Sequence, residues 1–121
     1  NYSWQAKPTV LSDPNPYPLT ELALPPTNRF NVGFNVDTAR FLGSASVNYA
    51  DKAFWSDVLT SAYHGYSDAY TMLNGAFGVK WDGGRITTLV KSTNITNQDI
   101  MQHVFGDILK RSVVAEVRFA Y

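Results

Sequence analysis

The sequence predicts an all-β protein in which about six antiparallel strands run up and down across one sheet. Apolar residues recur at every second position in several stretches, and this spacing is typical of strands with one apolar face. Short and long connections alternate between these stretches. Such alternation is expected when consecutive strands turn back at opposite ends of a sheet, with tight turns at one end and large loops at the other.

The first three strands are predicted from their alternating residues. Residues 1–6, NYSWQA, are expected to end a strand that has Tyr and Trp on one side. In residues 30–37, FNVGFNVD, Phe and Val alternate with Asn, Gly and Asp. In residues 39–50 the alternating set runs from Phe41 to Tyr49, with Ser and Asn on the opposite side. Each stretch is therefore expected to form a strand with one apolar and one polar or small face.

The later strands follow the same rule. In residues 70–81 the run LNGAFGVKW places Leu, Phe, Val and Trp on one side. Residues 85–94, RITTLVKSTN, are rich in β-branched side chains, but their facing is less clear. Residues 112–121, SVVAEVRFAY, form the last expected strand.

The connections support the up-and-down order. Asp37-Thr38-Ala39 joins one strand pair, and Asp82-Gly83-Gly84 joins another, where Gly tolerates the positive φ of a tight turn. The long connections are 7–29, which holds all six prolines, 51–69 and 95–110. No helix is expected, although DIMQHVFGDILK (99–110) has room for a helical turn.

Aromatic residues near the strand ends suggest that the sheet spans a membrane. Phe30 and Tyr49 are expected at the long-loop end, and the short-turn end is expected to hold Phe41, Trp81, Phe119 and Tyr121. Outer-membrane β-barrels carry aromatic girdles at both interfaces, with lipid-facing apolar residues between them. The apolar rows would then face lipid and the polar rows a lumen. A soluble β-sandwich, whose polar rows face water, fits the local pattern too.

Composition narrows the functional classes. Ten basic residues balance ten acidic ones, so no charge pattern indicates nucleic acid as a partner. Charged residues make up 17% of the chain, below the roughly 25% of soluble domains, which favours the membrane interpretation. Cysteine is absent, and no catalytic motif or close pair of metal-ligating residues occurs. We therefore expect neither an enzyme nor a cofactor.

The final strand resembles the C-terminal signature of bacterial outer-membrane β-barrels. In that signature a terminal aromatic residue is preceded by apolar residues at every second position. The matching positions here are Val113, Ala115, Val117, Phe119 and Tyr121. The resemblance implies that these residues are read by the barrel-assembly machinery.

Three further segments resemble the end of a TonB-dependent outer-membrane receptor. They are LPPTNRFNVGFNVD (24–37), AFWSDVL (53–59) and STNITNQDIMQHVFGDILKR (92–111). A strand of that family ends in a "TN-hydrophobic-x-N-Q" segment, matched by Thr93, Asn94, Ile95, Asn97 and Gln98. An aromatic-Gly stretch, Phe105-Gly106, then leads back to Lys110-Arg111 and the last strand.

This resemblance implies that residues 1–121 are the C-terminal β-barrel portion of a larger protein in the bacterial cell outer membrane. The family has a 22-stranded barrel, and its plug domain and earlier strands would lie upstream. The parent would import a scarce nutrient, such as a metal chelate or a glycan. Its partners would be outer-membrane lipid, its own barrel and plug, and a TonB-type energy-coupling protein. A non-transporting structural or adhesive barrel and a soluble β-sandwich binding module remain the alternatives.

The long loops contain the candidate ligand contacts. Residues 51–70, DKAFWSDVLTSAYHGYSDAY, are dense in aromatic side chains, and the two histidines of the chain lie in separate long loops. Aromatic loops on a rigid scaffold often bind ligands, although they also pack against neighbouring loops. The candidate extracellular contacts are Trp55, Tyr63, His64, Tyr66 and His103.

Overall fold

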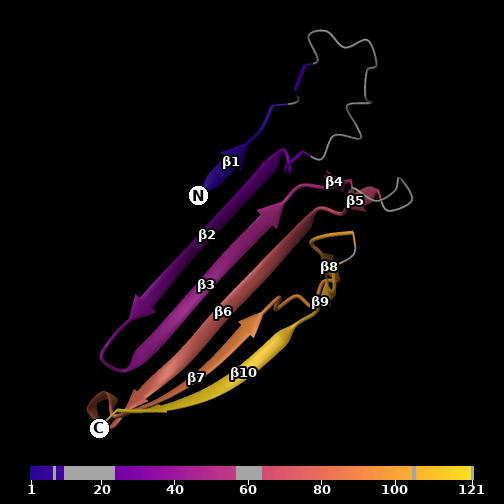
Figure 1. Ribbon diagram of the computed structural model, residues 1–121. Helices are drawn as coiled ribbons and strands as arrows, with labels where there is room; N and C mark the ends of the chain where they lie inside the picture. Colours follow the sequence, from indigo (N-terminus) through magenta and orange to yellow (C-terminus); the bar gives the residue numbers. More distant parts are fainter. Residues whose placement is uncertain (7, 10–23, 57–63, 105, 121) are drawn as a thin grey trace.

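The computed structural model describes residues 1–6, 8–9, 24–56, 64–104 and 106–120, and this part of the chain is all-β with antiparallel pairing. Six strands form the main sheet in the order β1-β2-β3-β6-β7-β10 (Figure 1). Their bounds are Tyr2–Trp4 (β1), Asn28–Asp37 (β2), Phe41–Ala50 (β3), Tyr70–Trp81 (β6), Ile86–Thr93 (β7) and Ser112–Phe119 (β10). These are the six strands that the sequence predicts, with ends shifted by a few residues.

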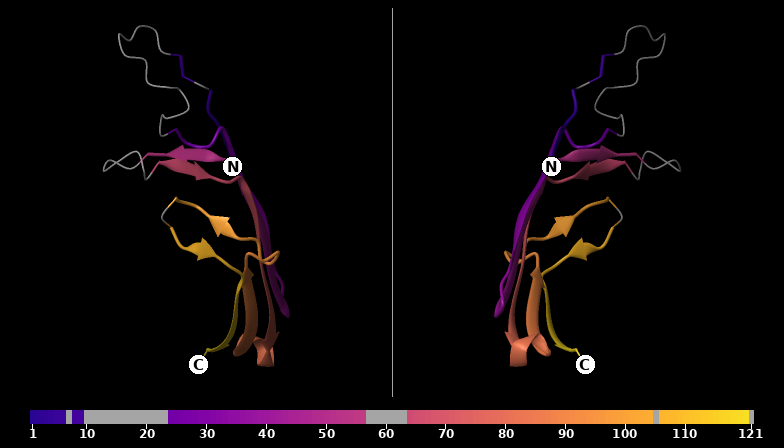
Figure 2. Two further views of the ribbon diagram at one scale, coloured as in Figure 1. Left: turned by 90° about the vertical axis from the view of Figure 1, so that its right-hand side faces the viewer. Right: turned by 90° about the vertical axis from the view of Figure 1, so that its left-hand side faces the viewer.

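Two short hairpins extend from the long-loop end of the sheet. Strand β4 (Ala53–Trp55) pairs with β5 (Gly65–Ser67), and β8 (Ile100–Met101) pairs with β9 (Ile108–Leu109). Both hairpins project to the same side of the sheet (Figure 2). The sequence does not predict these strands, because each is only two or three residues long and lacks room for a visible alternation.

The described residues of 99–110 form no helical turn. Ile100 pairs with Leu109 and Met101 with Ile108, so apolar residues at helix-like spacing instead form a hairpin. The described residues form one 3-10 turn, Asp82–Gly84, which makes the tight β6–β7 connection with positive φ at all three positions. None of the helical structure described is long and apolar enough to cross a membrane.

The strand register places the apolar residues on one face across all six strands. Phe34 pairs with Ala45, and Phe77 lies between Gly43 and Val90 in register. We call this surface the apolar face. It comprises Tyr2, Trp4, Phe30, Val32, Phe34, Val36, Phe41, Ala45, Val47, Tyr49, Leu73, Phe77, Val79, Trp81, Ile86, Val90, Val113, Ala115, Val117 and Phe119.

Little covers the apolar face, because the sheet is a single layer (Figure 2). Phe34 is 63% exposed, Phe77 60% and Phe119 67%. Large apolar side chains exposed side by side over several strands indicate a surface that needs apolar surroundings which the described residues do not supply.

The described aromatic residues that the sequence places at strand ends lie there, whereas Phe34 and Phe77 lie within β2 and β6. Phe30 and Tyr49 stack with ring centroids 5.2 Å apart at the long-loop end. Phe41 and Phe77 are 6.1 Å apart towards the short-turn end. Trp81 and Phe119 also lie at that end, next to Ile86 in register. Tyr121 lies outside the described residues.

The opposite surface, the polar face, is held together by lateral polar contacts. Lys91 Nζ lies 2.7 Å from Glu116 Oε2, and Arg118 also pairs with Glu116. Lys80 forms an ion pair with Asp37 near the short-turn end. Leu42, Leu89 and Val114 interrupt the polar pattern. Leu89 is buried there because it packs over Gly78, where an added Cβ would lie 2.9 Å from Leu89 Cδ1.

Candidate functional site

A pocket lies where the β4–β5 hairpin leaves the sheet. Its base is formed on the polar face by Arg29, Ala50 and Tyr70, which are neighbours in register on β2, β3 and β6. The hairpin directly continues β3 and leads into β6, so its side chains form a wall above that base. The pocket has a volume of about 470 Å³, within the usual range for small-molecule sites. It is lined by Leu24, Pro25, Pro26, Arg29, Ala50, Asp51, Ala53, Phe54, Trp55, Ser67, Tyr70 and Gln102.

The indole of Trp55 is held in place by hydrogen bonds inside the hairpin. Its Nε1 donates to Ser67 Oγ over 3.1 Å, and the Ser67 hydroxyl donates to the Ala53 carbonyl over 3.3 Å. Ser67 is 5% exposed. Because the only polar atom of the indole is already bonded, Trp55 offers the pocket a fixed apolar surface.

The two hairpins contact each other beside this pocket. The Trp55 and His103 rings lie 4.7 Å apart, and Gln102 Nε2 donates to the Tyr70 hydroxyl over 3.3 Å. A Cβ added to Gly65 would lie 2.9 Å from Val104 Cγ1, so the backbone of β5 also approaches the second hairpin closely. The pocket wall is therefore a joint structure of both hairpins.

Asp51 fixes the start of the first hairpin to strand β2. Its Oδ2 accepts hydrogen bonds from the Asn28 backbone amide (3.0 Å) and side-chain amide (2.7 Å). Its Oδ1 accepts one from the Tyr49 hydroxyl. These hydrogen bonds hold the pKa of Asp51 below its usual value. The bond from Tyr49 lowers it most, and the bond from the Asn28 side chain comes next.

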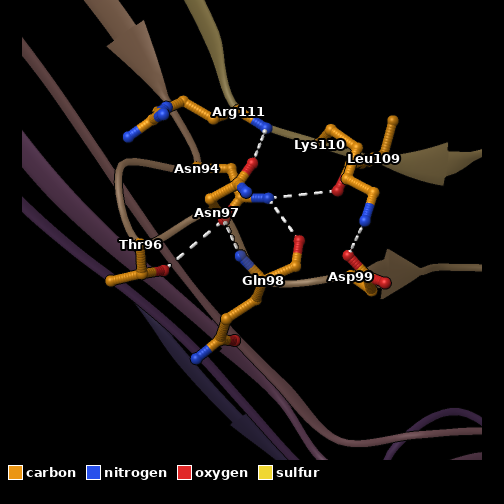
Figure 3. A network of polar contacts seen from close by, with 8 residues as sticks. All are labelled: Asn94, Thr96, Asn97, Gln98, Asp99, Leu109, Lys110 and Arg111. Atoms are coloured by element: carbon orange, nitrogen blue, oxygen red, sulfur yellow. Dashed lines mark hydrogen bonds and ion pairs between the residues drawn. The ribbon is translucent and has the colours of Figure 1, made fainter.

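Asn94 closes the neck of the second hairpin. Its side chain is 1% exposed, and its Nδ2 donates to the carbonyls of Gln98 (2.7 Å) and Leu109 (3.0 Å). Its Oδ1 accepts from the Gln98 amide over 3.1 Å (Figure 3). Asn97 adds a second bridge, since its Oδ1 accepts from the Arg111 amide over 3.1 Å. We call these two residues the asparagine clamp.

Both clamp residues have a left-handed backbone, with φ of 51° at Asn94 and 55° at Asn97. Asparagine tolerates this region better than most residues do. Lys110 also pairs with Asp99 across the same neck (Figure 3). The "TN-hydrophobic-x-N-Q" segment therefore has a local structural role: its two asparagines close the last long loop at its base.

The described candidate loop residues gather around the pocket, although only one of them lines it. Trp55 lines the pocket and His103 contacts Trp55. His64 and Tyr66 both pack edge-on against Phe54, with ring centroids 6.0 and 5.1 Å away. Tyr63 lies outside the described residues. Within the described ranges, no three His, Asp or Glu side chains group as metal ligands.

The remaining candidates lie on the last strand, far from the pocket in register. Val113, Ala115, Val117 and Phe119 occupy the apolar face of β10. The pocket residues outside the sequence candidates are chiefly Arg29, Tyr70 and Gln102. Tyr70 ends the aromatic-rich segment 51–70, whereas no period-two or motif signal distinguishes Arg29 and Gln102. Only the strand register brings Arg29 and Tyr70 to the same pocket.

The comparisons with known proteins give no relative: no family model, no curated protein and no solved structure matches the chain.

Proposed function

We propose that the chain is the C-terminal part of the barrel of a TonB-dependent receptor in a bacterial outer membrane. The observation that carries this proposal is the apolar face, which is continuous over six strands and remains exposed. A lipid-facing surface of this kind, bounded by aromatic residues at both strand ends, is what a membrane β-barrel requires. Outer-membrane lipid would cover the apolar face.

The arrangement of the two hairpins supports a receptor role. Both lie at the long-loop end and project to the same side of the sheet (Figure 2). That side carries the polar face, because Arg29 and Tyr70 line one pocket together with residues of both hairpins. In a closed barrel that side would be the lumen, so the hairpins would narrow the extracellular mouth. The remaining strands and the plug of the parent would complete the barrel, and a TonB-type protein would drive import of a scarce nutrient.

The mass of the native protein, extracted from its source with detergent, tests this proposal. A mass several times the 13.5 kDa of this chain, with a plug sequence upstream, is the expected result. A large barrel without a plug would favour a structural or adhesive protein that anchors loops and transports nothing.

A soluble β-sandwich makes the opposite prediction. A second sheet would then have to cover the apolar face, and the protein would be extracted without detergent. A native mass near 13.5 kDa in a detergent-free extract would therefore overturn the receptor proposal.

A further inference from the structure

We propose that the pocket at the base of the first hairpin binds a small organic anion, a carboxylate attached to a flat apolar ring system. This inference deepens the proposed function, because it names the chemical class that the receptor would recognise at its extracellular mouth. The inference depends on two observations. Most acceptor groups in the pocket already have hydrogen-bond partners, and donor groups remain available.

Most acceptor groups of the pocket are already used. Both carboxylate oxygens of Asp51 accept hydrogen bonds from Asn28 and Tyr49. The Ser67 hydroxyl accepts from Trp55 and donates to a backbone carbonyl. These groups therefore have little remaining capacity to bind the donors of a ligand.

Donor capacity remains open at the base of the pocket. Arg29 forms no hydrogen bond or ion pair with the described residues, so its five N–H donors are available. The Tyr70 hydroxyl accepts from Gln102 and keeps its own hydrogen to donate. Asp51 carries a negative charge in the same lining, but its oxygens already accept hydrogen bonds from Asn28 and Tyr49. The guanidinium of Arg29 is therefore the charged group that a ligand would meet, and its planar fork matches a carboxylate.

The remaining lining selects the body of the ligand. Arg29 and Tyr70 are two strand spacings apart, about 9.6 Å between backbones, with the small Ala50 between them. Phe54 and Trp55 line the pocket from strand β4, and Pro25 and Pro26 line it as well. A flat ring system that lies over Ala50 would contact these surfaces while its carboxylate reaches Arg29.

The test uses the intact protein that carries this chain, purified in detergent, with 2-naphthoate as the probe. Its neutral analogue 2-naphthylmethanol keeps the ring system and lacks the charge. Calorimetry should show that 2-naphthoate binds at least about tenfold more tightly than the alcohol. Arg29→Gln should remove this preference by weakening 2-naphthoate binding about tenfold.

Arg40→Gln is the matched control, because Arg40 is an exposed arginine in the tight turn at the opposite end of the sheet. It should leave binding of both probes unchanged. Equal binding of the acid and the alcohol, or equal losses in the two variants, would overturn the proposal. The two probes test the charge requirement on the unaltered protein, so the result does not depend on assembly of the Arg29 variant.

The same samples separate this inference from the proposed function. If neither probe binds but the protein still needs detergent and has the mass of a large barrel, the pocket proposal fails and the receptor proposal stands. If 2-naphthoate binds through Arg29 to a small protein that needs no detergent, the pocket stands and the receptor proposal fails.

Discussion

At the scale of single residues, two side chains each form several hydrogen bonds at the base of a hairpin. Asn94 and Asp51 each satisfy several backbone and side-chain groups at the point where a hairpin leaves the sheet. Asn94 is buried and Asp51 is half-buried, and removing either side chain leaves its partners without hydrogen bonds. The bases of the two hairpins therefore depend on these two side chains.

Replacing Asn94 by alanine should open the neck of the second hairpin. The substitution leaves the Gln98 amide and the Leu109 carbonyl without their partner and places alanine at a φ of 51°. We expect a local destabilisation of about 2–4 kcal/mol. Trypsin cleavage after Lys110 and Arg111 in the intact protein should be at least about tenfold faster.

Asn35→Ala is the control for this prediction. Asn35 lies exposed on the polar face, and its side chain makes no hydrogen bond to the described residues. Its substitution should leave the cleavage rate unchanged, and a similar acceleration in both variants would contradict a special role for Asn94.

The base of the first hairpin should weaken at low pH. The pKa of Asp51 is lower in the folded protein than in the unfolded chain, so its hydrogen bonds stabilise the fold above the unfolded pKa of about 4. This contribution is lost as the pH falls through the lower, folded pKa. The unaltered protein should therefore melt at a higher temperature than Asp51→Asn at pH 6, and the difference should shrink as the pH falls below about 4.

The measurement is the temperature at which each protein, in detergent, loses its folded form, which gel electrophoresis separates from the heated form. Other carboxylates titrate in both proteins, and the comparison cancels their effect. A difference that stays constant down to pH 2 would show that the charge of Asp51 does not stabilise the hairpin base.

At the scale of elements, strand β10 offers two matched positions that distinguish lipid from water. Val117 lies on the apolar face and is 56% exposed, whereas Val114 lies on the polar face and is 51% exposed. Their side chains are identical and their exposed fractions similar. In register Val114 lies opposite Lys91 and Val117 opposite Thr88, so a lysine at 114 also meets a like charge. A larger loss at Val117 would therefore come from what the apolar face meets.

If lipid covers the apolar face as proposed, Val117→Lys should lower the yield of folded protein, and Val114→Lys should be tolerated. A lysine on the lipid face costs about 2–4 kcal/mol near the middle of the bilayer, whereas a lysine on the lumen side stays hydrated. The level of heat-modifiable protein in outer membranes measures the effect. Equal levels for the two variants would indicate that both faces meet water.

At the scale of the whole molecule, the sheet separates its tryptophans into two environments. Trp4 and Trp81 lie on the apolar face, at its long-loop and short-turn ends, and Trp55 lies in the first hairpin beside the pocket. If lipid or detergent covers the apolar face, it contacts Trp4 and Trp81 and not Trp55.

A brominated detergent tests this arrangement, because bromine quenches tryptophans that it touches. In the intact protein, Trp81→Phe should reduce the quenchable fluorescence, and Trp55→Phe should reduce the fraction that resists quenching. The reverse pattern would contradict the assignment of the two faces.

Much of this architecture can be predicted from the sequence, because it depends on local alternation. The period-two pattern from Phe30 to Val36 identifies both the strand and its apolar face, and Asp82-Gly83-Gly84 identifies a tight turn. The hairpins and the pocket cannot be predicted in this way. Ile100 and Leu109 pair across a loop. Arg29 and Tyr70 line the same pocket from β2 and β6, which lie on either side of β3. These contacts depend on register between distant segments.

The asparagine clamp also has an evolutionary consequence. Because Asn94 and Asn97 bond to backbone groups at the neck, the closure of the hairpin depends little on which side chains lie beyond Met101 and before Ile108. A segment attached in this way is modular: its outer part can diverge, or accept a foreign peptide for display, while the strands beneath keep their register. Natural selection could thus vary the sequence of this segment without changing the sheet that holds it.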